Sequence, residues 1–147
     1  MRGGTAAAIA ALHLAALGLT GCSAASGADP QQQVRDYFAA NNAAARAGSA
    51  AQQEFFDRTQ HPDFTGQVCE LGGLTVQLDP AMSTLRPDPH YLPDGTRPPR
   101  GEVFVVGVEV TVRRDGTITG RQVGSQHVVL LDGTARGFAP CPSGSAA

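Results

Sequence analysis

His127 is the residue of this chain best suited to acid–base chemistry, because an imidazole gains and loses a proton near neutral pH. If it faces the inside of a folded sheet, it could act as a general acid or base with Glu109 or Asp63, or beside Arg121. In the alternative interpretation, which we prefer, it occupies an outward or rim-facing strand position. The chain contains no G-x-S-x-G, phosphate-loop or H-E-x-x-H motif. The sequence therefore assigns no catalytic residue, and His127 is the one candidate.

His90 and Tyr91 are candidates for binding, and they lie in the proline-rich stretch from Pro87 to Pro93. Prolines restrict the chain before it meets a partner, so ordering this stretch costs less entropy. One interpretation is therefore a semi-rigid recognition loop. The other, which we prefer, is a solvated loop whose prolines only limit its conformations.

Cys69 and Cys141 could form a disulfide, remain free thiols or contribute to a metal site. A metal site is not indicated, because neither cysteine belongs to a CxxC motif and the histidines at 61, 90 and 127 are widely separated. We therefore expect no metal and no cofactor. We expect a disulfide, since the leader described next directs the chain to an oxidising compartment. A bridge closing a loop of about 73 residues would contribute on the order of 4 kcal/mol to stability.

Residues 1–21 have the composition of a secretory signal peptide. Arg2 supplies the positive start, residues 6–19 are almost all apolar, and Thr20 and Gly21 are small residues ahead of a cleavage site. The apolar run has roughly 14 residues, whereas a helix that spans a bilayer needs about 20. We therefore expect a cleaved leader rather than a permanent membrane span.

The four residues Leu19, Thr20, Gly21 and Cys22 resemble a bacterial lipobox. In lipoproteins of this kind the cysteine receives a diacylglyceryl group and a peptidase cleaves immediately before it. The resemblance implies a protein held by Cys22 on the extracytoplasmic face of the cell membrane, since two acyl chains bind membranes stably. An ordinary secretory signal with an incidental cysteine is the alternative.

Composition limits the partners and the chemistry of the remaining chain. The 147 residues carry a formal net charge of −2, which becomes about −3 without Arg2, and no basic patch is present. Nucleic acid is therefore not an expected partner. All 11 basic residues are arginine, which excludes lysine Schiff-base chemistry. We expect the lipidated cysteine and a flexible tether at residues 22–29, one domain at 30–142 and a disordered tail at 143–147.

Two helices are predicted after the tether. Asp29 and Pro30 suit the cap and first position of a helix, and Gly48 suits its end. A second helix follows over residues 49–60. The residues expected in the core recur at helical spacing and are Val34, Tyr37, Phe38, Phe55 and Phe56.

Beyond Cys69 apolar and polar residues alternate, which predicts β-strands. The first strand covers residues 74–79. A segment with six prolines, residues 80–101, interrupts the pattern and is too proline-rich for a central strand. Residues 102–114 are the clearest strand, with phenylalanine and four valines on one face.

Two Asp-Gly pairs predict hairpin turns, at Asp115-Gly116 and at Asp132-Gly133. The strand between them, residues 117–131, has the wrong register to place Val128 on the valine face. A bulge near residues 120–124 would resolve part of this conflict, since glycine inside a strand often marks one. A last strand is expected over residues 135–141.

Two helices followed by a run of antiparallel strands predict an α+β fold, with a helical hairpin packed on a curved sheet. The order of elements resembles the nuclear transport factor 2-like (cystatin-like cone) fold, in which helices pack into the concave face of the sheet. The proline-rich segment departs from that pattern, because such folds often have a short helix or a simple loop there. A β-sandwich with N-terminal helices is the alternative.

We expect a non-catalytic binding or accessory domain of the cell envelope. The ligand would be another envelope protein, or an apolar small molecule in a concavity lined by Phe38, Phe55 and the valine face. The resemblance implies a fold that forms pockets, and enzymes of this fold use Asp, His or Arg inside the cone. The alternative function is therefore a small hydrolase or isomerase that uses His127 with a carboxylate. A spacer or assembly factor that acts through its anchored position is a third interpretation.

Overall fold

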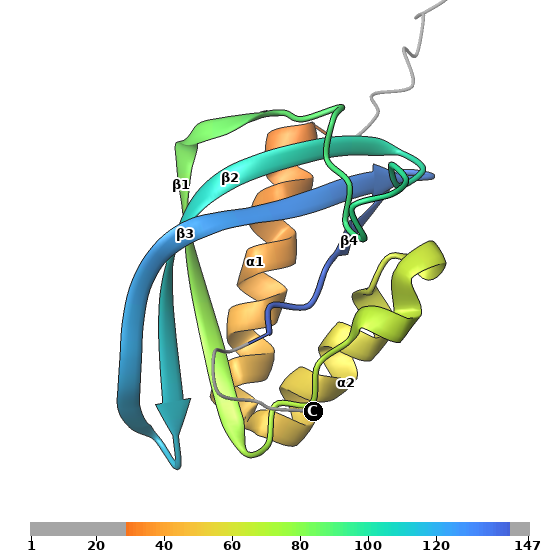
Figure 1. Cartoon of the computed structure of the whole chain (residues 1–147). Helices are drawn as coiled ribbons and strands as arrows, with labels where there is room; N and C mark the ends of the chain where they lie inside the picture. Colours follow the sequence, from red (N-terminus) through yellow and green to blue (C-terminus); the bar gives the residue numbers. More distant parts are fainter. Residues whose placement is uncertain (1–28, 142–147) are drawn as a thin grey trace, which may run out of the picture.

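The computed structural model describes residues 29–141, in which two helices precede one curved antiparallel sheet (Figure 1). The elements in chain order are α1 (Pro30–Ala47), α2 (Ser49–Thr59), the short 3-10 helix η1 (Pro62–Gln67), β1 (Leu74–Pro87), β2 (Glu102–Arg114), β3 (Thr117–Leu131) and β4 (Thr134–Gly137). The strands lie in the order β1-β2-β3-β4, and every neighbouring pair is antiparallel.

The predicted α+β class is confirmed, because the described residues form a single sheet rather than the two sheets of a sandwich. The predictions for the leader, for the lipobox with Cys22 and for the tail at 143–147 lie outside the described residues. Among residues 29–141, no helix combines the length and the apolar character needed to cross a membrane.

The helical hairpin forms as its capping residues predict. The carboxylate of Asp29 accepts a hydrogen bond from the Gln31 backbone N–H at 3.1 Å, and Pro30 occupies the first turn of α1. Gly48 ends α1 and starts α2 at a φ of 122°, which a residue with a side chain adopts only under strain. The helices bury one face each, with Phe38 and Phe56 each 1% exposed.

β1 corrects the sequence prediction, since it continues through Pro80 to Pro87 instead of stopping at residue 79. β1 is an edge strand, and the backbone groups of Val76 and Leu78 point outward from the sheet. By the same alternation the missing N–H of Pro80 falls on the outer side, so no ladder hydrogen bond is lost. An irregularity between Ala81 and Arg86 then bends the strand. The proline-rich loop is therefore residues 88–101.

A network of side-chain carboxamides closes the outer edge of β1. Gln52 Oε1 accepts from the Val76 N–H at 2.8 Å, and its Nε2 donates to the Val76 carbonyl at 2.6 Å. Asn42 makes the same paired contact with Leu78, at 2.9 Å in both directions. Asn41 links Gln52 to Asn42, because its Oδ1 accepts a hydrogen bond from Gln52 at 2.8 Å and its Nδ2 donates one to Asn42 at 3.0 Å. These helix side chains occupy the place of a neighbouring strand. They supply hydrogen-bond partners to the N–H and C=O groups that point outward from β1.

The register of β3 is set by a bulge at Thr119. Val112 pairs with Gly120 and Arg113 with Ile118, so Thr119 is the extra residue. The predicted bulge therefore exists, immediately before the expected 120–124 interval. Beyond it, the residues opposite the phenylalanine and valines of β2 are Gly120, Gln122, Gly124, Gln126 and Val128.

Both Asp-Gly turns form with positive φ at each central residue, 50° and 78° at Asp115 and Gly116 and 50° and 73° at Asp132 and Gly133. The last strand is shorter than expected, because β4 ends at Gly137. Residues 138–141 leave the sheet and pass toward the start of β1 (Figure 1).

The two faces of the sheet are covered unequally. The concave face, which carries Val106, Val108 and Val110, packs against the helices in the main core. Among residues 29–141, the opposite, convex face is covered at one end, where the proline-rich loop 88–101 crosses β2 and β3 (Figure 1). There Val103 and Val129 form a second apolar cluster with Phe64 and Phe138, against which Tyr91 packs.

Candidate functional site

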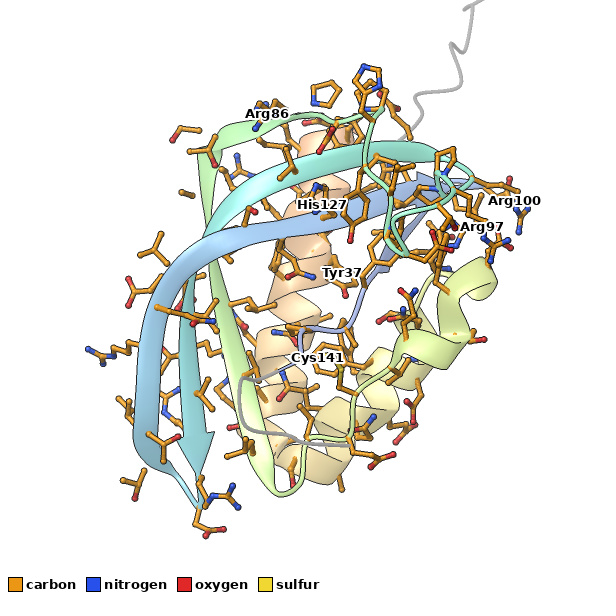
Figure 2. The ribbon with its side chains drawn as sticks, in the orientation of Figure 1. Tyr37, Arg86, Arg97, Arg100, His127 and Cys141 are labelled. Atoms are coloured by element: carbon orange, nitrogen blue, oxygen red, sulfur yellow. A yellow bond between two sulfur atoms is a disulfide. The ribbon has the colours of Figure 1, made fainter. Side chains whose placement is uncertain are left out.

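Cys69 and Cys141 are joined as a disulfide, with their Cα atoms 5.4 Å apart and 72 positions apart in the sequence. The bridge ties the segment after β4 to the segment that enters β1, and Figure 2 shows Cys141 between the sheet and the helices. Segment 138–141 is therefore held beneath the sheet, where it borders the hollow described next.

A hollow of about 590 Å³ lies on the concave side of the sheet, toward the β2–β3 turn. Its lining comes from all three long strands and from the segment that ends at the disulfide. The residues that line it include Leu74, Val76, Val108, Val110, Val112, Gly120, Gln122, Gly124, Gln126, Pro140 and Cys141. Its volume lies within the range of small-molecule sites in proteins, about 300–1,000 Å³.

The hollow exists because β3 contributes little side-chain volume there. Gly120 and Gly124 stand opposite Val112 and Val108, and no atom lies within 4 Å of the point where a Cβ would be at either glycine. An apolar side chain at these positions would extend the core over the valines. Glycine instead leaves that space empty.

The charged residues next to the hollow are Arg114 and Arg121, and among the described lining residues there is no carboxylate. By the alternation of β3 the side chain of Arg121 is directed to the convex face, so Arg114 supplies the charge of the rim. The site therefore combines an apolar floor with a positive rim. Phe38 and Phe55, which the sequence suggested as lining residues, lie in the core between the helices and the sheet and do not line the hollow. The valine face does line it, as expected.

His127 lies on the convex face, beneath the proline-rich loop, as Figure 2 shows. Its Nε2 is 2.9 Å from Oδ2 of Asp88, and its ring stacks on Tyr91 with the centroids 3.6 Å apart and the planes 8° from parallel. The hydrogen bond from His127 lowers the pKa of Asp88 below its ordinary value, and the backbone N–H of His90 adds to the effect.

The partners suggested for His127 are placed elsewhere. Asp63 forms a two-pronged ion pair with Arg100, at 2.8 and 2.9 Å, which lowers the pKa of Asp63. Glu109 pairs with Val123 in the ladder, and Arg121 with Thr111, both nearer the β2–β3 turn than His127 is. The carboxylate that does meet His127, Asp88, lies in the proline-rich segment, where the sequence pattern carried no sign of it.

The His127 cluster holds the loop against the sheet. The imidazole is 17% exposed, one of its faces is covered by Tyr91, and it does not line the concave hollow. His90 is exposed. The loop is therefore attached to β3 through Asp88 and Tyr91, and a binding role for His90 and Tyr91 stays a prediction.

His61 has a structural role that the sequence did not reveal. It is fully buried, its ring stacks on Phe138 with the planes 8° from parallel, and its Nδ1 accepts from the Asp63 backbone N–H at 3.2 Å. Its Nε2 lies 2.9 Å from the Arg100 carbonyl, so this nitrogen is the one that carries the hydrogen. His61 therefore joins η1 to the proline-rich loop.

Within residues 29–141, no group of three or more His, Cys, Asp or Glu side chains is arranged to hold a metal ion. Comparison with known proteins finds no match to this chain among family models, curated proteins or solved structures. The concave hollow and its rim are thus the features of the described residues from which a function can be argued.

Proposed function

We propose that this chain is an exported lipoprotein, anchored through a diacylglyceryl group on Cys22 to the extracytoplasmic face of the cell membrane, whose folded domain binds a ligand without transforming it. The lipobox-like residues Leu19, Thr20, Gly21 and Cys22 support the anchor. The hollow of about 590 Å³, which combines a floor of valines from β1 and β2 with polar residues of β3, supports the binding role and is the observation that carries it.

The chemistry of the hollow supports binding rather than catalysis. Its floor is made of aliphatic side chains and glycines, and its polar groups are amides, hydroxyls and the Arg114 guanidinium, which lacks a nearby carboxylate partner in the described lining. General acid–base catalysis needs a group that exchanges protons near neutral pH within reach of the substrate. The lining offers none. The ligand that fits is an apolar group or segment that carries a negative charge.

The resemblance of the fold also supports a ligand-binding role. A helical hairpin against the concave face of a curved sheet is the arrangement of the nuclear transport factor 2-like fold, whose members form pockets at this place. We propose this relationship on the order of elements alone. It supports a ligand site in the hollow and does not name a ligand.

An enzyme that uses His127 is the second candidate, and the contact of 2.9 Å with Asp88 is the observation in its favour. A carboxylate that orients an imidazole is a common arrangement in catalysis. This pair lies on the convex face, however, and Tyr91 covers the imidazole ring. We therefore assign the pair to anchoring the loop.

Acyl labelling tests the anchor. Cells that express the full chain are fed an alkyne fatty acid, and the protein is expected to become labelled and to partition into detergent. Cys22→Ser is expected to lose both properties, while Cys69→Ser with Cys141→Ser, the matched control, keeps them. Labelling that persists in the Cys22→Ser variant would contradict the proposal.

Fluorescence of anilinonaphthalene sulfonate tests the hollow, because this probe joins an apolar ring system to a negative charge. The full chain is expected to bind it, and Gly124→Leu is expected to weaken binding about tenfold by filling the hollow. Val123→Leu is the matched control, since it puts leucine on the opposite face of the same strand. Equal binding by both variants would place the probe elsewhere and contradict the proposed site.

A further inference from the structure

Within residues 29–141, one long side of β3 has no neighbouring strand along most of its length. β4 pairs only with residues 128–131 of β3, so residues 117–126 have β2 on one side and, among the described residues, no strand on the other. We call the outer side of residues 117–126 the open edge.

The ladder geometry shows which residues point their backbone groups outward at the open edge. The N–H of Gly107 donates to Thr84 Oγ1 of β1 at 2.8 Å, so Gly107 directs its backbone groups away from β3. Backbone groups alternate along a strand, and Gly107 lies opposite Ser125. Ser125 and, by the alternation, Val123 and Arg121 therefore direct N–H and C=O outward from the sheet. Within the described residues, no backbone hydrogen bond reaches these groups.

Of the usual protections of an edge strand, the open edge has the bulge at Thr119, near the β2–β3 turn, and little else among the described residues. Proline and helix cover are absent from it in the described part of the chain, and its charge is the single arginine Arg121. Val123 at its centre is 85% exposed. The other edge of the same sheet is closed by Gln52 and Asn42, which shows that this fold can close an edge with two amides. An exposed apolar strand edge is a template for another strand.

The open edge is continuous with the hollow. Seven of the ten residues of the open edge line the hollow, and Gly120 and Gly124 leave gaps on the concave side of β3, one on each side of Gln122. A strand laid along the edge would direct alternate side chains to the concave side. Those side chains, passing the two glycines, would enter the hollow, while the others would lie beside Val123 on the convex side.

The rim charges define the chemistry of the partner. An added strand would have Arg114 at the rim of the hollow on its concave side and Arg121, which shares the convex face with Val123, on its other side. A negatively charged segment is favoured by this field, and a positively charged one is disfavoured.

We propose that the open edge of β3 and the adjoining hollow accept an extended segment of a partner protein as a fifth strand, with large apolar side chains at alternate positions and at least one acidic residue. This rests on the proposed function, since it uses the hollow as the binding site. Backbone hydrogen bonds to residues 121, 123 and 125 supply affinity, and the hollow selects the alternate side chains.

Selection from a displayed library of short linear peptides tests this proposal with the full chain purified in detergent. The selected peptides are expected to alternate large apolar and polar residues and to contain Asp or Glu. Two N-methylated forms of a selected peptide are then compared, one methylated at the odd-numbered amides and the other at the even-numbered amides. One form is expected to bind about tenfold more weakly than the other, because only that form loses the N–H groups that face β3.

Two variants of the chain locate the contact. Val123→Pro removes an outward N–H and is expected to weaken peptide binding about tenfold, whereas Val123→Thr keeps the N–H and is expected to change binding less than about threefold. Gly124→Leu is expected to weaken the same peptides by filling the hollow. Circular dichroism checks that each variant is folded. Hydrogen exchange in the wild-type chain is expected to slow at residues 121, 123 and 125 when the peptide binds.

Three outcomes would overturn the proposal. The library could yield no enriched peptide, or the enriched peptides could bind Val123→Pro as tightly as the wild-type chain. The chain could instead form a dimer that Val123→Pro abolishes, which would make a second copy the occupant of the edge. If anilinonaphthalene sulfonate binds in the hollow but peptides do not, this inference fails and the proposed function stands; if neither binds, both fail.

Discussion

The two edges of the sheet are treated in opposite ways. At β1, Gln52 and Asn42 supply a donor and an acceptor each to the outward backbone groups, and the α1–α2 hairpin buries them. At β3, residues 121, 123 and 125 have the same outward groups and no such cover among the described residues. The comparison shows that closing a sheet edge in this fold requires polar helix side chains placed beside the outward N–H and C=O groups of the edge strand. Where they are absent, the edge is available to a partner.

The two ends of β3 show the same contrast in apolar contacts. Near Val128 and Val129 both faces are covered, one by the helices and the other by the proline-rich loop, and each residue is fully buried. Near Val123, no other part of residues 29–141 covers the convex face, and the concave face borders the hollow. Stability is thus concentrated at one end of the strand and accessible surface at the other.

Removal of the disulfide is expected to have the largest effect on this contrast, since the bridge fixes the segment that borders the hollow. Replacing Cys69 and Cys141 by serine should lower the free energy of unfolding by about 4 kcal/mol in the chain-entropy model, because the unfolded chain regains a large loop. Urea denaturation measures the change. Cys22→Ser, which leaves the bridge intact, is the control, and an unchanged midpoint in the double variant would show that the bridge does not stabilise the fold.

Gln52→Ala is expected to open the closed edge and to cost about 3 kcal/mol of stability. The substitution leaves the buried N–H of Val76 unpaired and weakens the bonding of its carbonyl, which keeps a contact of 3.2 Å with Asn41. Gln122→Ala is the matched control on the open side of the sheet, where glutamine is exposed, and should change stability by less than about 0.5 kcal/mol. Equal losses in the two variants, measured by chemical denaturation, would refute the distinction between the edges.

Loss of the contact between His127 and Asp88 is expected to have the smallest effect on stability. The effect should depend on pH and should concern the end of β3 that the proline-rich loop covers. The folded protein lowers the pKa of Asp88 below 3.8, so the contact contributes stability above that pH and loses it as the pH falls through the lowered pKa. His127→Gln should return the pKa of Asp88 toward its ordinary value, as followed by NMR of the side-chain carboxyl carbon.

Asp94 provides the internal control for this titration. Its pKa is held far below the ordinary range by hydrogen bonds from Thr96 and Arg97, which do not involve His127. It should therefore be unaffected by His127→Gln. A pKa of Asp88 that is already ordinary in the wild-type chain, or that is unmoved in the variant, would show that the loop is not held by this pair.

Local chemistry made part of the fold predictable. Asp29 and Gly48 bound the first helix because capping and positive φ are decided by neighbouring residues, and each Asp-Gly pair turns a hairpin for the same reason. The conflict of register in residues 117–131 even indicated a bulge, which the structure has at Thr119.

The candidate site was less predictable, because it depends on contacts between distant segments. The valine face was expected to line a concavity and does so, whereas Phe38 and Phe55 are buried in the core between the helices and the sheet. Polar residues at helix positions 42 and 52 carried a usable signal, since buried amides in amphipathic helices need partners. The partners of these amides lie on β1, far away in the sequence, so the closing of the β1 edge follows from the structure alone.

By itself the sequence determined the helices, the turns, the α+β class and the pair of cysteines available for a bridge, since each follows from residues near one another or from simple counting. Only the tertiary structure decided that β1 runs through Pro80, that Asp88 rather than Glu109 or Asp63 meets His127, and that one sheet edge is closed while the other is open. These outcomes depend on which strand lies at the edge and on which loop crosses which face. Such choices follow from the packing of the whole chain, and no local pattern encodes them.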